Sequence, residues 1–90
     1  MLTPVRSVQF KRDVRKAEKR GKNMNKLRTL LSLLIEEKPL PKYYCDHPLK
    51  GAWAGCRDSH VEPDWLLIYR IERDKSHLVH TGTYTDLFQG

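Results

Sequence analysis

The sequence contains no long apolar run and only two cysteines. No stretch approaches the roughly 20 apolar residues that a membrane-spanning helix needs, and no basic segment followed by an apolar run opens the chain. We therefore expect no membrane partner, no signal peptide and a cytoplasmic location. Reduced thiols are the default for Cys45 and Cys56 in a cytoplasmic chain, although a disulfide is possible. The two cysteines form no CxxC pair, which argues against a structural zinc site.

The chain is also short, with 90 residues and neither internal repeats nor low-complexity tracts. We expect one domain over residues 1–90, because a chain of this size buries only roughly 60–65% of the surface that its unfolded form exposes. That supports one modest core and leaves little room for an enclosed substrate chamber. A functional site should therefore be an open cleft.

Acidic residues are scarce in the first third of the chain. Between Arg6 and Arg28 there are ten Lys or Arg residues and only two acidic ones, Asp13 and Glu18, whereas the remainder is slightly acidic. Such a block is typical of proteins that bind polyanions, such as nucleic acid, the ribosome or an anionic membrane. A solvated helix face is the simpler alternative, but the density of the block favours RNA or DNA.

Apolar residues at helical spacing predict two helices after a short strand. Phe10 and Ala17 fall on one face and predict the first helix over residues 9–20. A wider apolar stripe predicts the second helix over residues 24–37. The segment before the first helix, residues 5–9, can form a short strand.

Three further strands are expected in the second half of the chain. The middle one carries apolar residues on both faces, a pattern typical of a central strand, so its second face is either packed or the floor of a cleft. The sequence thus predicts an α+β fold in the order β-α-α-β-β-β, with two helices on a twisted antiparallel sheet of about four strands. The later strands are expected over residues 55–61, 65–71 and 76–83.

Side chains suited to RNA chemistry lie in the second half of the chain, apart from the basic block. Metal-free RNA cleavage needs a base for the 2′-hydroxyl, an acid for the leaving oxygen and a cation for the charge on the phosphorane. Histidine can act as base or acid near neutral pH, arginine binds phosphate oxygens, and aromatic rings stack on unpaired bases. The candidates are His47, His60, Asp64, Arg57, Trp65, Tyr84 and Phe88.

Three of the candidates also have simpler interpretations. His47, before a proline in a loop, is more often a surface histidine than a catalytic one, and Asp64 is a standard turn residue. Trp65 begins an apolar strand and can belong to the core. A zinc site of His47, His60, Asp64 and Cys45 is conceivable, but the spacing matches no ligand pattern. The residues alone indicate a basic RNA-binding domain with parts of a nuclease, without metal or cofactor.

Three longer motifs together span much of the chain: KNMNKLRTLLSLL, then DHPLKGAWAGCRDSHVEPDWLLIY, then TGTYTDLF. They resemble YafQ-type toxins of the RelE superfamily, and the likeness runs from the first strand to Phe88. The resemblance implies the toxin of a bacterial type II toxin–antitoxin system, with the RelE-like fold of small microbial RNases. It also implies an mRNA interferase, an endoribonuclease that cuts mRNA in the ribosomal A site without a metal and so inhibits translation.

By the same resemblance, the family's functional positions fall in both halves of the chain. The catalytic positions would be His47, His60, Asp64 and Tyr84. The contacts to mRNA would be Arg57, Trp65 and Phe88. The basic first helix would contact ribosomal RNA through Lys11, Arg12, Arg15, Lys16, Lys19 and Arg20.

One catalytic position departs from the family pattern. YafQ-type sequences usually have histidine after TGT, where this chain has Tyr84. A tyrosine side chain ordinarily has a pKa of about 10 and is a poor base near pH 7 unless cations lower that pKa. Other branches of the superfamily use a tyrosine near the C-terminus, so two hypotheses stand. The protein is either an active endoribonuclease or an inactive toxin-like protein that only binds antitoxin and ribosome.

The resemblance also implies partners. These are a RelB/DinJ-like antitoxin, the 70S ribosome and mRNA, with DNA reached indirectly through the ribbon-helix-helix part of the antitoxin. A physical reason supports the antitoxin as well. A toxic basic cleft is readily silenced by an acidic, partly disordered segment that folds on binding.

Overall fold

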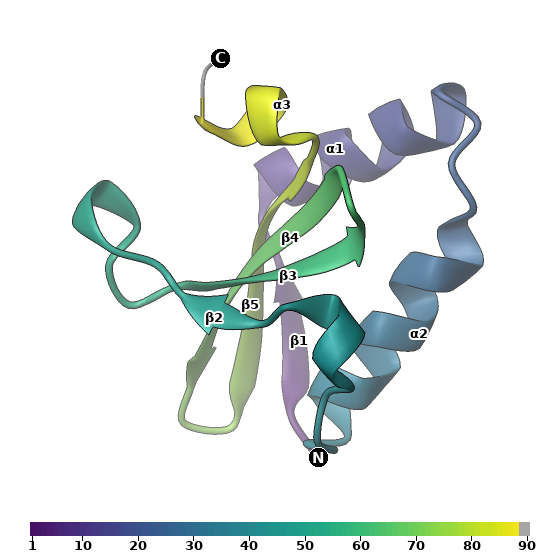
Figure 1. Cartoon of the computed structure of the whole chain (residues 1–90). Helices are drawn as coiled ribbons and strands as arrows, with labels where there is room; N and C mark the ends of the chain where they lie inside the picture. Colours follow the sequence, from purple (N-terminus) through teal and green to yellow (C-terminus); the bar gives the residue numbers. More distant parts are fainter. Residues whose placement is uncertain (89–90) are drawn as a thin grey trace.

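The computed structural model describes residues 1–88, in which helices pack on a five-stranded sheet (Figure 1). Helices α1 and α2 lie on one side of the sheet, and the short α3 lies at the end of β5, as Figure 1 shows. The elements are β1 Thr3–Arg6, α1 Val8–Lys19, α2 Met24–Ile35, η1 Lys42–Tyr44, β2 His47–Pro48, η2 Gly51–Trp53, β3 Arg57–Glu62, β4 Trp65–Glu72, β5 Lys75–Gly82 and α3 Tyr84–Phe88.

The sheet is mixed and five-stranded, whereas the sequence predicted an antiparallel sheet of about four strands. Its order is β1-β5-β4-β3-β2, which confirms β4 as the central strand. β1 runs parallel to β5, with Val5 opposite His77. A parallel pair needs a long connection, and the chain between these two strands begins with α1 and α2. The additional strand, β2, has only two residues, too few for an alternating pattern to reveal it.

Ser7 sets the boundary between the first strand and the first helix, earlier in the chain than the sequence predicted. It is the N-cap of α1, and its hydroxyl accepts a hydrogen bond from the Phe10 amide at 2.9 Å. The same hydroxyl donates to the Val79 carbonyl of β5 at 2.7 Å. Ser7 therefore ends β1 and fixes the start of α1 against the sheet.

The apolar faces of α1 and α2 form the main core with one face of the sheet, which confirms both predicted helices. Burial of these side chains provides the main driving force for the fold. None of the helices within residues 1–88 has the length and apolar character to cross a membrane. The buried cluster includes Phe10, Ala17, Leu27, Leu30 and Leu34 from the helices and Trp65, Leu67, Tyr69 and Leu78 from the sheet.

The opposite face of the sheet is only partly covered. Leu66 and Ile68 of β4 pack there with Cys56 and Leu87, and Trp53 from the loop after β2 packs against them. This second face of the central strand is thus packed at one end. On β2 and β3 this face is open to solvent at His47 and His60, although Asp58 is buried.

Helix α3 lies outside the elements that the sequence predicted, although its start carries a recognisable signal. The Asp86 amide donates to the Thr83 hydroxyl at 3.1 Å, and the Thr83 amide donates to the Asp86 carboxylate at 3.0 Å. This reciprocal pair is a capping box, here in the form Thr-x-x-Asp. The helix has five residues, too few to show a helical period in the sequence.

Candidate active site

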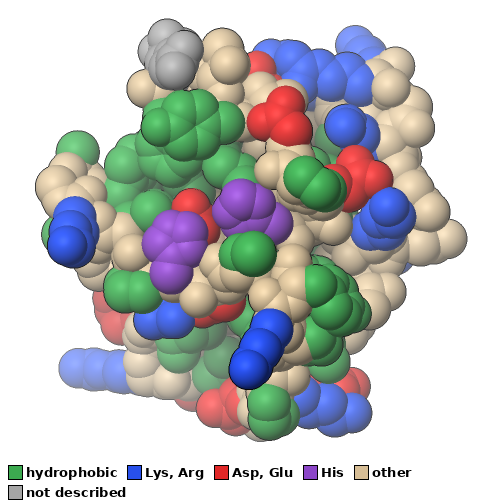
Figure 2. Space-filling view, in the orientation of Figure 1, with side chains coloured by type: hydrophobic (Ala, Val, Ile, Leu, Met, Phe, Trp, Pro, Cys, Tyr) green, Lys and Arg blue, Asp and Glu red, His purple; other side chains and the backbone are tan. Residues whose placement is uncertain are grey.

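The open face of the sheet brings His47 and His60 together around Asp58. Cross-strand pairing places His47 of β2 opposite Asp58 of β3, and His60 lies two residues further along β3 on the same face. Both histidines are accessible to solvent, whereas the Asp58 side chain is only 6% exposed. In the view of Figure 2, histidine side chains lie in the middle of the visible surface, next to hydrophobic side chains.

The imidazole of His47 is held through its Nδ1 atom. That atom lies 2.9 Å from the carbonyl oxygen of Cys45 and 3.1 Å from Oδ1 of Asp58. Because a carbonyl oxygen can only accept, Nδ1 carries the hydrogen. Nε2 is then the nitrogen that can exchange a proton with a ligand.

His60 is held in the same way at the turn between β3 and β4. Its Nδ1 lies 3.3 Å from the carbonyl oxygen of Pro63, so this hydrogen bond also assigns the hydrogen to Nδ1. A groove of about 550 Å³ lies beside the ring, between this turn and the segment that contains Tyr43 and Cys45. An extended ligand therefore has access to His60.

Asp58 is a buried carboxylate on the sheet face that carries both histidines. Burial raises its pKa, the charges of His47 and His60 oppose that rise, and nearby Asp46 adds to it. Its Oδ1 atom is buried and accepts no hydrogen bond within residues 1–88. Asp58 is missing from the site that the sequence predicted. Its spacing of two residues from His60 within a strand is the signal that could have found it.

Arg57 lies on the other face of β3 and is paired with Asp46. Its Nε donates to Asp46 at 2.7 Å, and Ser59 and Tyr69 donate to the same carboxylate. The bond to Asp46 raises the pKa of Arg57, while burial and then Asp46 raise the pKa of Tyr69. This network anchors the segment just before His47 to the sheet. The arginine that the sequence predicted as a phosphate contact is therefore directed away from the histidines.

Asp64 lies close to Tyr84 instead of His60. Its Oδ1 accepts a hydrogen bond from the Tyr84 amide at 3.2 Å, which ties the β3–β4 turn to the start of α3. No hydrogen bond joins Asp64 to His60 within the described part of the chain. Tyr84 is 55% exposed, and its ring centroid lies 5.0 Å from that of Phe88. The structure thus brings three predicted site residues together at α3.

Aromatic rings extend from α3 across the apolar side chains that pack around Leu66 and Ile68. The Phe88 ring packs edge-on against Trp53 at 6.3 Å between centroids, and Trp53 lies 6.3 Å from the ring of His80. Trp53 is half-buried, so part of its ring is accessible for stacking on a base. It is also missing from the site that the sequence predicted, although an aromatic residue in a glycine-rich loop is a usable signal.

Trp65 lies in the core on the helix-covered face, apart from the histidines. It is 1% exposed, and its indole N–H donates to the Thr81 hydroxyl at 3.0 Å. The ammonium group of Lys22 lies 5.9 Å from the centre of the indole ring. A buried ring has no face available for stacking on a base, so the structure favours the core interpretation of Trp65.

The basic residues of α1 and of its C-cap are all exposed. Lys16 and Arg20 form ion pairs with Asp86, at 3.4 and 2.7 Å. The other cations have no ion pair with a side chain in residues 1–88, which leaves their charge available for a polyanion. These are Lys11, Arg12, Arg15 and Lys19.

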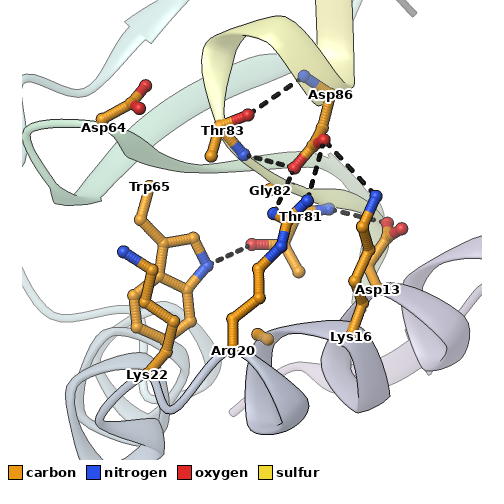
Figure 3. Close-up of a pocket in the computed structure, with 11 residues that line it drawn as sticks. Asp13, Lys16, Arg20, Lys22, Asp64, Trp65, Thr81, Gly82, Thr83 and Asp86 are labelled. Carbon is orange, nitrogen blue, oxygen red and sulfur yellow. Dashed lines mark hydrogen bonds and ion pairs between the residues drawn. The ribbon is translucent and has the colours of Figure 1, made fainter.

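A narrow cleft lies where α1 meets the end of β5 and the start of α3, as Figure 3 shows. The carboxylate of Asp86 bonds there to Arg20, Lys16 and Thr83. The bond from Arg20, reinforced by Thr83, holds the pKa of Asp86 well below its usual range. Because these side chains satisfy one another, we interpret the cleft as a structural joint between the two helices.

The open face therefore carries groups suited to proton transfer. Two imidazoles, each anchored through Nδ1 to a backbone carbonyl, present Nε2 as a base and an acid. Within residues 1–88, no cluster of three His, Cys, Asp or Glu side chains is arranged to hold a metal ion. Both cysteines are unpaired.

The whole chain matches one family of known proteins. The family described as "Bacterial toxin of type II toxin-antitoxin system, YafQ" matches residues 2–89. The chain belongs to the YafQ toxin family. This membership confirms the resemblance carried by the three sequence motifs, and it makes the protein a type II toxin–antitoxin system toxin.

Relatives share both sequence and fold over nearly the full length. The mRNA interferase toxin YafQ of Escherichia coli strain K12 is 52% identical over 83 residues, which cover 91% of this chain and 90% of that protein. A chain of the crystallised E. coli DinJ–YafQ complex is 48% identical, with a TM-score of 0.91 over 98% of this chain and 99% of that one. A metal-bound toxin from Helicobacter pylori is 37% identical, with a TM-score of 0.92 over 98% and 100%. These likenesses confirm the predicted α+β, RelE-like fold.

Proposed function

We propose that this YafQ-family toxin is a ribosome-dependent endoribonuclease. It cuts mRNA in the ribosomal A site by attack of a 2′-hydroxyl on the adjacent phosphate, without a metal, and so inhibits translation. The observation that carries the proposal is the pair of histidines on the open sheet face, each with Nε2 left for proton exchange. The name of the E. coli relative, mRNA interferase toxin YafQ, supports mRNA as the substrate.

In this proposal the two imidazoles divide the proton transfers. One takes the proton of the 2′-hydroxyl, and the other protonates the leaving 5′ oxygen. Tyr84 contributes its exposed hydroxyl, Asp64 either transfers a proton or orients Tyr84 through its amide, and Phe88 stacks on a base of the mRNA. The exposed cations of α1 supply affinity for ribosomal RNA.

Cleavage of a defined mRNA on programmed 70S ribosomes tests the assignment. The parent should cut in the A-site codon, and His60→Ala should slow cleavage by about 100-fold or more, since a general acid or base typically contributes that much. His77→Ala is the matched control, because His77 lies on β5 beside β1, away from β2 and β3. If His60→Ala cuts as fast as the parent, the role given to His60 is wrong.

Metal independence requires a separate cleavage assay, because the H. pylori relative is metal-bound. The parent should keep full activity in EDTA. Activity that disappears in EDTA and returns with a divalent cation would replace the metal-free mechanism with a metal-dependent one.

Tyr84 favours a second candidate function, a toxin-like protein that binds its partners without cutting. Expression of the parent in cells that lack an antitoxin separates the two functions. Growth arrest by the parent supports the active enzyme. Arrest only with Tyr84→His supports the inactive protein.

The partner that we propose is a DinJ-like ribbon-helix-helix antitoxin, by analogy with the E. coli complex. Contact with DNA would then come through the antitoxin. Copurification with such an antitoxin, and release of translation inhibition when it is added, would support this pairing.

A further inference from the structure

We infer that Asp58 is a positioning residue, whose carboxylate lies against Nδ1 of His47 and stabilises the imidazolium ion that forms when Nε2 takes a proton. The inference rests on the proposed function, because it assumes that His47 exchanges a proton with RNA. Asp58 itself lies too deep to contact the RNA, with its side chain 6% exposed. It would act through His47.

The carboxylate of Asp58 contains a buried acceptor atom that has no hydrogen-bond donor among residues 1–88. Oδ1 of Asp58 is buried and accepts no hydrogen bond within the described residues. Buried polar atoms without partners are rare, because each one costs stability, and those that occur need an explanation. One such explanation is that this oxygen pairs with the imidazolium ion of His47, which forms only during the reaction.

The geometry of the neighbouring ring is a further observation behind this inference. Nδ1 of His47 lies 3.1 Å from this oxygen while its hydrogen bond goes to the Cys45 carbonyl at 2.9 Å. The neutral ring is thus already oriented, with Nε2 free to accept. When Nε2 takes the 2′-hydroxyl proton, the freed oxygen attacks phosphorus, the bond from phosphorus to the 5′ oxygen breaks, and His60 supplies the proton for that oxygen. The positive charge left on His47 then lies against Asp58.

The surroundings of Asp58 strengthen this charge interaction. The titratable or charged groups that act on it are His47 of β2, His60 of β3 and the carboxylate of Asp46 before β2. On β4 its cross-strand neighbour is Ile68, which is apolar and fully buried. An apolar environment screens the attraction between a carboxylate and an imidazolium far less than water does. Of the two histidines, His47 has the direct contact.

Asp58→Asn removes the charge and keeps the shape of the side chain. Cleavage on programmed ribosomes should slow by roughly tenfold or more, with the dependence on ribosome concentration unchanged. The rising limb of the pH–rate profile should move to lower pH, because an imidazole without the adjacent anion loses its proton more readily. Asp74→Asn, an exposed turn residue, is the matched control and should change neither property.

A double-variant cycle tests whether Asp58 acts through His47. In a His47→Ala background, Asp58→Asn should slow cleavage by less than about threefold, because a residue that acts through another adds little once that other is gone. An equal loss in both backgrounds, with an unshifted pH–rate profile, would show a purely structural role and overturn the inference.

NMR of the parent keeps the inference testable if the variant does not fold or if the parent does not cleave. The Asp58 carboxyl carbon and the His47 ring are followed in one pH titration. Each should report the ionisation of the other, because the two groups are in contact. Independent single-step titrations would overturn the inference. A parent that couples these groups but leaves mRNA uncut would instead count against the proposed function.

Discussion

For individual residues, the face of β3 that a side chain occupies decides what it can do. Asp58 and His60 share the open face, whereas Arg57 and Ser59 point the other way and bond to Asp46. A slip of one residue in the pairing of β3 would exchange these two sets. The position of the histidines on one face and the bonds to Asp46 on the other therefore depend on the same register of β3.

Trp65 provides the test of a core role against an RNA-binding role. Trp65→Ala should lower the free energy of unfolding by about 3–5 kcal/mol, because truncating a buried aromatic side chain leaves a cavity. Tyr43→Ala is the control: Tyr43 is 72% exposed, and its loss should change stability by less than about 0.5 kcal/mol. Urea unfolding measures both. Nearly wild-type stability for Trp65→Ala would contradict the core role.

The sequence singles out His47, His60 and Tyr84 because they stand in long motifs of a known family, and their catalytic roles stay predictions. Asp58 and Trp53 escaped prediction for a physical reason. An aspartate beside an arginine looks like an ordinary solvated charge, and only tertiary packing shows that it is buried. The pairing of Arg57 with Asp46 also escaped prediction, because it is a contact between separate parts of the chain.

Among the secondary-structure elements, α3 owes its position to a charged joint. Asp86 caps the helix and also binds Arg20 and Lys16 of the first helical segment. Glycine at position 82 leaves room for this carboxylate, because a Cβ atom there would lie only 2.9 Å from Oδ2 of Asp86. The placement of Tyr84 and Phe88 thus depends on α1.

Asp86→Asn keeps an oxygen that can accept from the Thr83 amide but removes the charge that pairs with Arg20 and Lys16, so it should lower stability at neutral pH by roughly 0.5–1 kcal/mol. The folded pKa of Asp86 is lowered, so its stabilisation is complete above the unfolded value of about 3.9 and is lost as the pH falls below it. The difference in unfolding free energy between parent and variant should therefore be constant from about pH 5 to 7 and shrink from about pH 4 to 2.

Urea unfolding at each pH measures this difference, with Asp74→Asn as the control for an exposed aspartate. The control should differ little from the parent at any pH. A difference for Asp86→Asn that persists unchanged at the lowest pH would show that the charge of Asp86 is not its source.

Periodicity predicted the elements that are long enough to display it, namely both main helices and strands β3, β4 and β5. β2 and α3 were beyond reach because two and five residues complete too little of a period. The parallel pairing of β1 with β5 was also beyond reach. It joins residues near position 5 to residues near position 77, and no local pattern encodes such a contact.

In the molecule as a whole, the exposed cations of α1 and the candidate catalytic histidines occupy different regions. Helix α1 packs on β5, whereas the histidines lie on β2 and β3 toward the other edge of the sheet. Affinity for a polyanion and the rate of cleavage should therefore respond to different substitutions.

The double substitution Arg12→Gln with Arg15→Gln tests this separation. Ribosome binding should weaken, and the slope of log K against log salt should fall by roughly 1 to 2, because two phosphate contacts are lost. Cleavage by the bound protein should keep its rate. The control is Arg73→Gln with Lys75→Gln, which removes the same charge at the β4–β5 turn. Equal weakening by both pairs would show that net charge alone governs binding.

The pairing of β1 with β5 also affects the timing of folding during synthesis. β1 is made first, yet its partners span Lys75 to Leu78, so the strand stays unpaired until nearly the whole chain has been translated. Such long-range pairing forms late and slowly. A product that terminates before residue 75 would lack the partner of β1 as well as the α3 segment with Tyr84. Only full-length chains would therefore form the complete candidate site in a cell that makes this toxin.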